Sequence, residues 1–367
     1  MPAKTRLAAV VSDPGLGTRV QAHLDDFLAG RQVLLDQMGP ETAPLIEQAA
    51  AAVAGGKRLR PAFCLAGWRA AGGDAADEHV VGAAASLELL QASALMHDDL
   101  MDDSDMRRGR PSAHRAFERL HRDAGWHGDP VRFGAGAAVL LGDLLLAWAY
   151  ELLRDCGLGP EPVTRAAPWF DACTTEVSTG QYLDLVAQAT ATASEEMALR
   201  VVRFKAASYT VVRPLHLGAA LAGAGEELHA GLAAYGTPVG IAFQLRDDVL
   251  GVFGDPDHTG KPAGDDLREG KRTVLLARTA ERSDDHGRAL IARLVGDRDL
   301  GTEGLRLLRG LITSTGALAS VEHTIRALHA EALTALDTLA LVARGDGAED
   351  VRTDLAGLAT AAVQRTR

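Results

Sequence analysis

Five aspartates and three arginines lie close together in the segment LELLQASALMHDDLMDDSDMRRGRP, residues 87–111. Asp98 and Asp102 are four residues apart, so on a helix their carboxylates lie one turn apart on the same face. Like charges at this spacing repel, and a divalent cation is the obvious reason to keep them, since Mg²⁺ takes carboxylate oxygens together with substrate phosphates. The carboxylates therefore predict a metal site, and the arginines that follow them predict a bound diphosphate.

A helix over residues 78–105 is expected to carry these carboxylates, because Gly109 and Pro111 cannot continue it. A turn after Asp105 could bring Arg107 and Arg108 back over the carboxylates. The segment would then combine carboxylates, metal and arginines in one diphosphate site.

Two further segments carry groups of the same kind. A glycine pair at 55–56 precedes Lys57 and Arg60, and glycines let the backbone approach an anion to which the adjacent cations supply charge. The second acidic segment, QLRDDVLG at 244–251, ends a helix predicted over 235–249 and is followed by a lysine-bearing, glycine-rich segment. Two apolar helices that end in aspartate pairs, each followed by a basic loop, suggest two arms of one cavity.

The composition favours an all-α fold. The chain of 367 residues is 47% hydrophobic but only 4% aromatic, Ala, Leu and Val dominate, and no sustained period-two alternation appears. We predict helices over 20–38, 42–54, 62–71, 134–153, 168–187 and 195–208 besides those above, a surface loop over 121–133, and buried carboxylates at Asp143 and Asp184.

Charge and cysteine usage exclude several functions and locations. A net charge of −11 argues against nucleic acid as a partner. The three isolated cysteines match no zinc spacing and indicate a reducing cytosol. The sequence has no signal pattern, and no apolar run reaches the roughly 20 residues that span a bilayer. We therefore expect a cytoplasmic protein with no transmembrane segment.

With these motifs the chain resembles the trans-isoprenyl diphosphate synthases of the polyprenyl synthetase family, and most of all the bacterial geranylgeranyl diphosphate synthases. The matching pieces are GGKRLRP at 55–61, HDDLMDDSDMRRGRPSAH at 97–114, GD at 142–143, GQYLDL at 180–185, Lys205, and QLRDDVLGVFGDPDHTGKPAGDDLREGKRT at 244–273. They follow the family's order. The two aspartate motifs, each followed by basic residues, are in combination highly specific for the family.

The resemblance implies an all-helical isoprenoid-synthase fold and a homodimer. We expect a single domain over 1–367, in which residues 1–15 form a loose lead-in. It implies that three Mg²⁺ ions bind at two aspartate motifs, which face each other across a central cavity. Carried over residue by residue, the metal ligands are Asp98, Asp99, Asp102, Asp247 and Asp248. The allylic diphosphate is bound by Arg107, Lys205, Gln244, Lys261 and Lys271, and isopentenyl diphosphate is bound by Lys57, Arg60, Gln91 and Arg108. The implied catalytic set is Asp98, Asp102, Arg107, Lys205, Asp247 and Lys261.

The chain departs from the family pattern in the second aspartate motif and in one loop. Gly251 stands where the family often has a third aspartate, and Asp255 is a candidate to compensate for it. The loop over 121–133 is longer than usual in the family, which could alter access to the site or the dimer surface.

Product length is expected to depend on the residues before Asp98. In the family, bulky aromatic residues four or five positions before that aspartate stop the product at farnesyl, and here Ala94 and Ser93 are small. Leu90 and Leu87, one and two turns deeper, could form a floor at geranylgeranyl length. The alternatives are a farnesyl or longer polyprenyl product, and a non-catalytic regulatory subunit of another synthase. Such a subunit usually lacks one aspartate motif, and a terpene cyclase has a different second motif, whereas this chain keeps Asp247 and Asp248.

Overall fold

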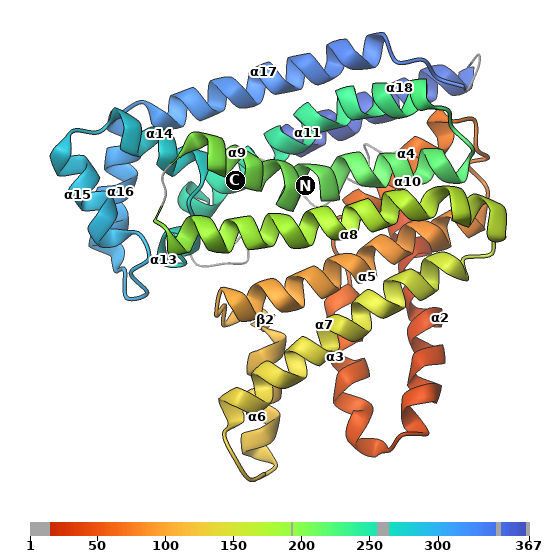
Figure 1. Cartoon of the computed structure of the whole chain (residues 1–367), viewed down its shortest axis with the longest axis horizontal. Coiled ribbons are helices and arrows are strands. Elements are labelled where there is room, and N and C mark those ends of the chain that lie inside the picture. The colour runs from red at the N-terminus through yellow and green to blue at the C-terminus, as the bar shows by residue number, and fades with distance from the viewer. Residues whose placement is uncertain (1–14, 192–193, 255–263, 343–345, 365–367) are drawn as a thin grey trace. The chain divides into compact units, whose positions relative to one another are not determined.

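The computed structural model describes residues 15–191, 194–254, 264–342 and 346–364. Predictions that fall on residues 1–14, on Asp255 or on Lys261 lie outside these described residues. The described chain is almost entirely helical, which confirms the predicted all-α class (Figure 1).

The helices and strands follow in chain order. They are α2 (Leu16–Asp36), the 3₁₀ helix η1 (Pro40–Thr42), α3 (Ala43–Val53), α4 (Leu59–Ala70), α5 (Glu78–Met101), β1 (Met106–Arg107), β2 (Arg110–Pro111), α6 (Ala113–Asp123), α7 (Pro130–Arg154), α8 (Pro160–Ala189), α9 (Glu195–Val201), the π-helix η2 (Val202–Val212), α10 (Arg213–Leu221), α11 (Glu226–Phe253), α13 (Asp265–Arg268), α14 (Val274–Arg282), α15 (Asp285–Leu294), α16 (Thr302–Ser314), α17 (Ala317–Asp337) and α18 (Asp346–Val363).

The chain forms two compact units. Unit 1 comprises residues 1–171, 213–230 and 340–358, and unit 2 comprises 172–212, 231–339 and 359–367. Each unit is assembled from three segments, so the units are not consecutive domains along the sequence. The single domain over 1–367 stays a prediction.

In unit 1, the long helix α5 packs against α7, α4 and α2 (Figure 1). Helices α4 and α10 approach each other at backbone distance, because a Cβ at Gly218 would lie 1.8 Å from the carbonyl oxygen of Cys64. Only a residue without a side chain allows this approach. The tight packing fixes α4, which begins at Leu59, three residues after the glycine pair of the basic segment (residues 55–60).

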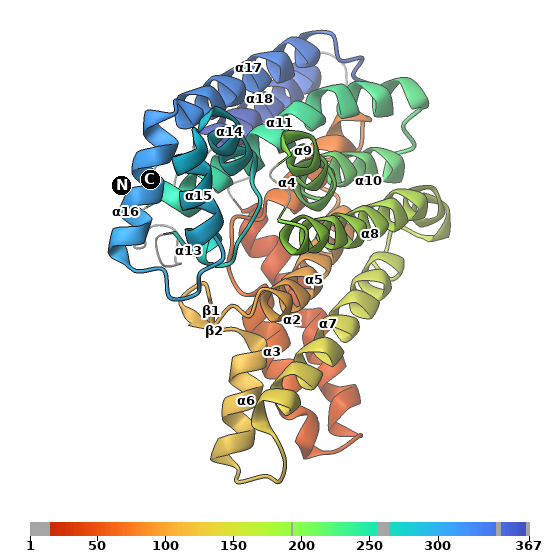
Figure 2. The same cartoon turned by 60° about the vertical axis from the view of Figure 1, so that its left-hand side comes forward.

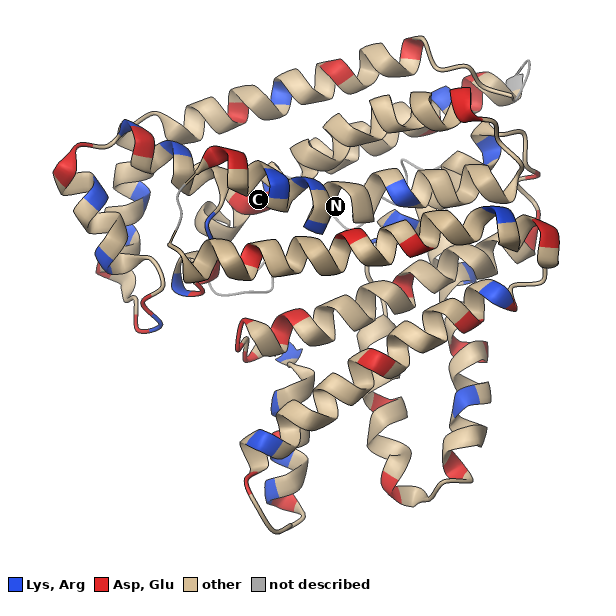
Figure 3. Ribbon diagram, in the orientation of Figure 1, with Lys and Arg blue, Asp and Glu red and all other residues tan. Residues whose placement is uncertain are grey.

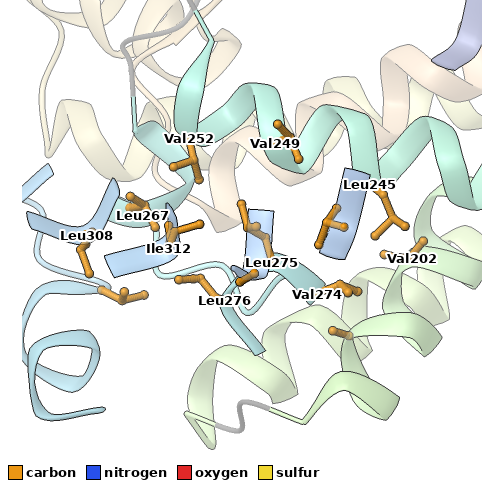
Figure 4. Packing of buried hydrophobic residues seen from close by; sticks show 14 of the residues in the cluster. Val202, Leu245, Val249, Val252, Leu267, Val274, Leu275, Leu276, Leu308 and Ile312 are labelled. Carbon is orange, nitrogen blue, oxygen red and sulfur yellow. The ribbon is translucent and has the colours of Figure 1, made fainter. Parts of the chain in front are cut away.

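In unit 2, a hydrophobic core lies beneath the second acidic segment (Figure 4). Leu245, Val249 and Val252 project from α11 into it at helical spacing, and each is at most 6% exposed. Leu267 and buried residues of α14, α16 and α17 are part of the same core. The apolar stripe of α11 therefore fixes the face that carries Gln244, Asp247 and Asp248.

Several predicted boundaries were wrong. Helix α5 ends at Met101 rather than at Asp105, because Asp103 takes a left-handed backbone conformation with φ of 54°. The predicted loop 121–133 is shorter, since the end of α6 and the start of α7 leave only 124–129 between them. Helices α8 and α11 begin earlier than predicted and continue through Pro168 and Pro238.

Two described helices, α5 and α7, each contain an apolar stretch long enough to cross a membrane. By length and composition alone α5 and α7 could each cross a membrane, so the statement that no apolar run is long enough was wrong. In α5, 78% of the apolar window is buried inside the protein, as in an ordinary core helix, whereas 39% of the window in α7 is buried. Core helices of soluble proteins pass the same test, so the absence of a transmembrane segment stays a prediction.

Candidate functional site

The first acidic group sits where α5 ends. Asp98 and Asp99 lie in its last turn and Asp102 is its C-cap, with the Asp102 N–H donating to the Asp98 carbonyl oxygen at 2.8 Å. Asp98 and Asp102 therefore stay one turn apart, as the spacing predicted. Asp99 and Asp102 are buried, at 1% and 4% exposure. Figure 3 shows acidic residues gathered at this helix end with basic residues beside them.

The β1–β2 hairpin follows α5 (Figure 2). Its two adjacent arginines make different contacts. Arg107 returns to the carboxylates, where its Nε donates to Asp99 Oδ1 at 2.8 Å and its Nη2 lies 3.4 Å from Asp98 Oδ2. Arg108, with a φ of 53°, instead lies over the basic segment, where a Cβ at Gly56 would be 3.6 Å from its Nη2. The expectation that both arginines return to the carboxylates was right for Arg107 and wrong for Arg108.

The basic segment precedes α4 in a loop of unusual backbone conformation. Gly55 and Gly56 have φ angles of 66° and 96°, which favour glycine. Lys57 is exposed, and Arg60 lies half-buried in the first turn of α4. The structure therefore brings Arg108 to the Lys57 segment from a position about fifty residues away. Gln91 is half-buried on α5.

The second acidic group lies in unit 2, near the end of α11. Asp248 is 5% exposed and its Oδ1 accepts a hydrogen bond from Gln244 Nε2 at 2.8 Å, while Asp247 is half-buried. Burial raises the pKa of Asp248 to about 8, the carboxylates of Asp266 and Asp247 add to the increase, and Gln244 and Lys271 oppose it. Without a metal, Asp248 is therefore mainly protonated at pH 7.

Asp266 lies against Gly251, the position at which the second motif lacks a third aspartate. A Cβ at Gly251 would lie 1.8 Å from Asp266 Oδ2, so the carboxylate rests directly on the Gly251 backbone. Lys271 Nζ lies 3.5 Å from Asp266 Oδ1 and 2.6 Å from Glu269 Oε2. Sequence reasoning missed Asp266. The signal that could have found it is the GDD segment 264–266, which follows the helix within a few residues of Lys271.

Lys205 is held by α8. Gly180 allows the close approach, since a Cβ there would lie 2.3 Å from the backbone nitrogen of Lys205. One turn later on α8, Asp184 is 6% exposed and accepts a hydrogen bond from Lys205 Nζ at 2.7 Å. Lys205 itself lies in the π-helix η2, a type of helix frequent at functional sites. The predicted burial of Asp184 is confirmed.

The predicted burial of Asp143 was wrong, because its side chain is 63% exposed and its Oδ1 lies 3.5 Å from His97 Nε2.

The carboxylates of the two acidic groups suit a hard divalent cation that binds together with the phosphates of the substrate. Among the described residues, no three Asp, Glu, His or Cys side chains form a metal site by themselves. Each acidic group instead offers a few carboxylates beside cationic side chains. Mg²⁺ usually binds through one or two carboxylates and completes its coordination with water and substrate phosphates. The residues present therefore fit Mg²⁺ bound with a diphosphate.

The four residues named for product length all lie on α5. Leu87, Leu90 and Ser93 are buried, at 1%, 2% and 3% exposure, and Ala94 is half-buried. Leu87, Leu90 and Ala94 share the helix face of Asp98, and Leu87 lies eleven residues, about 16 Å, before it.

Comparison with known proteins gives consistent matches. The sequence pattern of the family described as polyprenyl synthetase matches residues 43–306. A geranylfarnesyl diphosphate synthase of Aeropyrum pernix is 35% identical over 276 residues, 74% of this chain and 80% of that protein. A geranylgeranyl diphosphate synthase of Saccharolobus solfataricus is 32% identical over 69% of this chain and 71% of its own length.

Among solved structures, a geranylgeranyl pyrophosphate synthase from Corynebacterium glutamicum, complexed with isoprenyl diphosphate and magnesium, has a TM-score of 0.90. It is 41% identical in sequence, and the match covers 96% of this chain and 99% of that one.

Proposed function

Because the chain belongs to the polyprenyl synthetase family, we propose that this prenyltransferase joins isopentenyl diphosphate head to tail to an allylic prenyl diphosphate. The allylic C–O bond breaks and its electron pair leaves with diphosphate. The alkene carbon C4 of isopentenyl diphosphate then bonds to the allylic C1, and the proton lost from C2 passes to the released diphosphate. None of these reaction steps needs a nucleophile from the protein.

The observation that carries the proposal is the divergence of Arg107 and Arg108. Arg107 pairs with Asp98 and Asp99, whereas Arg108 lies over Gly56 in the basic segment. Adjacent residues thus serve two separate anion-binding groups, one with carboxylates suited to a metal diphosphate, the other with mainly basic side chains. A condensation of two diphosphates needs these two kinds of binding group.

The proposed metal ligands are Asp98, Asp99 and Asp102 in the first group, and Asp247 and Asp248 in the second, with three Mg²⁺ ions in all. Bound Mg²⁺ would supply positive charge that stabilises the departing diphosphate. Asp266 is a described carboxylate that would support the second group, because it rests on Gly251.

The cationic side chains bind and orient the diphosphates. We assign Arg107, Lys205, Gln244, Lys261 and Lys271 to the allylic diphosphate. Lys57, Arg60, Gln91 and Arg108 are assigned to isopentenyl diphosphate. Asp184 holds Lys205 at 2.7 Å, which limits the rotamers that its long side chain samples before substrate binds.

We propose geranylgeranyl diphosphate as the main product. Small residues at Ser93 and Ala94 leave room beyond farnesyl length, and Leu90 and Leu87 would stop further growth. Relatives named for the geranylgeranyl product support this length, and the geranylfarnesyl relative shows that the family also makes longer chains.

We also propose a cytoplasmic homodimer. The exposed side of α7 supports the dimer, since Leu140 and Val139 are 62% and 41% exposed on an apolar helix. The cytoplasmic location is supported by Cys64, Cys156 and Cys173, which are buried and form no disulfide.

The deciding experiment is product analysis by mass. Purified protein is given isopentenyl diphosphate with dimethylallyl, geranyl or farnesyl diphosphate, with and without Mg²⁺. We expect a metal-dependent geranylgeranyl product. Arg107→Gln should raise the KM of the allylic substrate, and Arg108→Gln that of isopentenyl diphosphate. A longer product would support the condensation reaction but contradict the proposed limit on product length at Leu90 and Leu87. No condensation by folded protein would overturn the proposed function.

A further inference from the structure

The basic segment contains one arginine that is buried. Arg58 is 6% exposed, whereas the neighbouring Lys57 is exposed and Arg60 is half-buried. Arg58 is also the N-cap of α4, with φ of 51° and ψ of 38°, a left-handed conformation that residues with a side chain rarely adopt. Such a conformation persists only when surrounding contacts hold it, and it is common at ligand-binding sites.

The contacts that hold Arg58 come from three other helices or helix ends. Its guanidinium forms an ion pair with Glu88 on α5, and both side chains are 5% exposed. Its Nη2 donates to the carbonyl oxygen of Val53, at the end of α3, at 2.7 Å, and to the side-chain oxygen of Gln21 on α2. The same oxygen of Gln21 accepts from the Gly55 N–H at 3.3 Å. One buried side chain therefore ties the loop to α2, α3 and α5.

Glu88 places a negative charge near a cluster of cationic side chains, which comprises Arg58, Arg60 and Arg108. Burial lowers the pKa of the Arg108 guanidinium; Arg107, Arg58 and Arg60 lower it further, and only the Glu88 carboxylate raises it. Cations gathered to bind a diphosphate repel each other when no substrate is bound. A buried carboxylate that is itself paired offsets this repulsion without competing for the exposed face of the cluster.

We propose that Arg58 and Glu88 are a positioning pair that holds the basic loop in the geometry required to bind isopentenyl diphosphate. The proposal rests on the proposed function of Lys57, Arg60 and Arg108. Arg58 does not reach the substrate itself. It fixes the backbone between Lys57 and Arg60, so both cations are oriented before the diphosphate arrives, and less entropy is lost on binding.

The test measures how each substrate's KM and kcat respond when the pair is removed. Arg58→Met and Glu88→Gln should each raise the KM of isopentenyl diphosphate about tenfold or more, since misplacement by ~1 Å can cost up to 10²-fold. The kcat at saturating isopentenyl diphosphate and the KM of the allylic substrate should change less than about threefold. Arg58→Lys should not restore KM, because an ammonium cannot replace the planar fork of guanidinium donors.

A double variant separates positioning from stability. Removing one partner leaves a buried charge and destabilises the fold, whereas replacing both by apolar residues is often neutral. Arg58→Met with Glu88→Leu should therefore regain thermal stability and keep the raised KM of isopentenyl diphosphate. A double variant with wild-type KM would overturn the proposal.

The matched control is Arg69→Met. Arg69 lies on the same helix α4 and in the same unit, and forms a similar ion pair with Asp354, whose side chain is 4% exposed. It should lower stability without changing the KM of isopentenyl diphosphate, and an equal rise in KM would overturn the positioning role. Calorimetry with inorganic diphosphate separates the two proposals. If wild-type protein makes no prenyl product, the proposed prenyltransferase function is wrong. Even then, loss of diphosphate binding in Arg58→Met and its retention in Arg69→Met would support the positioning role of Arg58 and Glu88.

Discussion

The buried carboxyl of Asp248 should make the stability of the metal-free protein depend on pH. Its pKa is about 8 in the folded protein and 3.8 in the unfolded chain. Between these values the folded state holds one more proton than the unfolded state, so the free energy of unfolding falls as pH rises. The slope is about 1.36 kcal/mol per pH unit, and the contribution lost between pH 5 and pH 7 is about 2.7 kcal/mol.

Asp248→Asn should remove this slope, because an amide has the size of the protonated carboxyl and does not ionise. The stability of the variant relative to wild type should therefore grow by about 2.7 kcal/mol between pH 5 and pH 7. The assay is urea unfolding followed by circular dichroism, in chelator-treated protein at several pH values. Taking the difference between the two proteins cancels the contributions of titrating groups that do not interact with Asp248.

Asp285→Asn provides the matched control, since Asp285 is a fully exposed carboxylate at the start of α15 in the same unit. The free energy of unfolding of the Asp285→Asn variant should change with pH in the same way as that of the wild type over this range. If Asp248→Asn is also parallel to wild type, the carboxyl is ionised in the folded protein and the reasoning from burial is wrong. With Mg²⁺ and inorganic diphosphate added, wild-type protein should release a proton at pH 7, and Asp248→Asn should release less.

Three further perturbations test the second acidic group, the product length and the assembly. Gly251→Ala should destabilise the protein by about 1–3 kcal/mol in thermal unfolding, because its Cβ would meet Asp266 Oδ2. Adding Asp266→Ala should restore that stability, and a stable single variant would contradict the close approach. Leu87→Ala should lengthen the product and Ala94→Phe should shorten it to farnesyl, as read by mass spectrometry; an unchanged product from both would refute the floor. Leu140→Glu should turn a dimer into a monomer in light scattering, and a monomeric wild type would refute the dimer.

The sequence by itself determined the groups whose arrangement depends on local geometry. Asp98 and Asp102 lie one turn apart because a helix repeats every 3.6 residues, whichever helices surround it. The end of α5 shortened by four residues without disturbing that pair. Composition alone likewise predicted the all-α class. The donor types and their order along the chain were also enough to indicate carboxylates, metal and diphosphate.

Only the tertiary structure decided which distant residues meet. The separation of Arg107 from Arg108 depends on a hairpin that packs against a loop about fifty residues earlier. The placement of Asp266 on Gly251 and the ion pair of Arg58 with Glu88 are also long-range contacts, which periodicity along one helix cannot predict. Burial follows the same rule: whether a carboxylate on an apolar helix is buried or exposed depends on which face its neighbours cover.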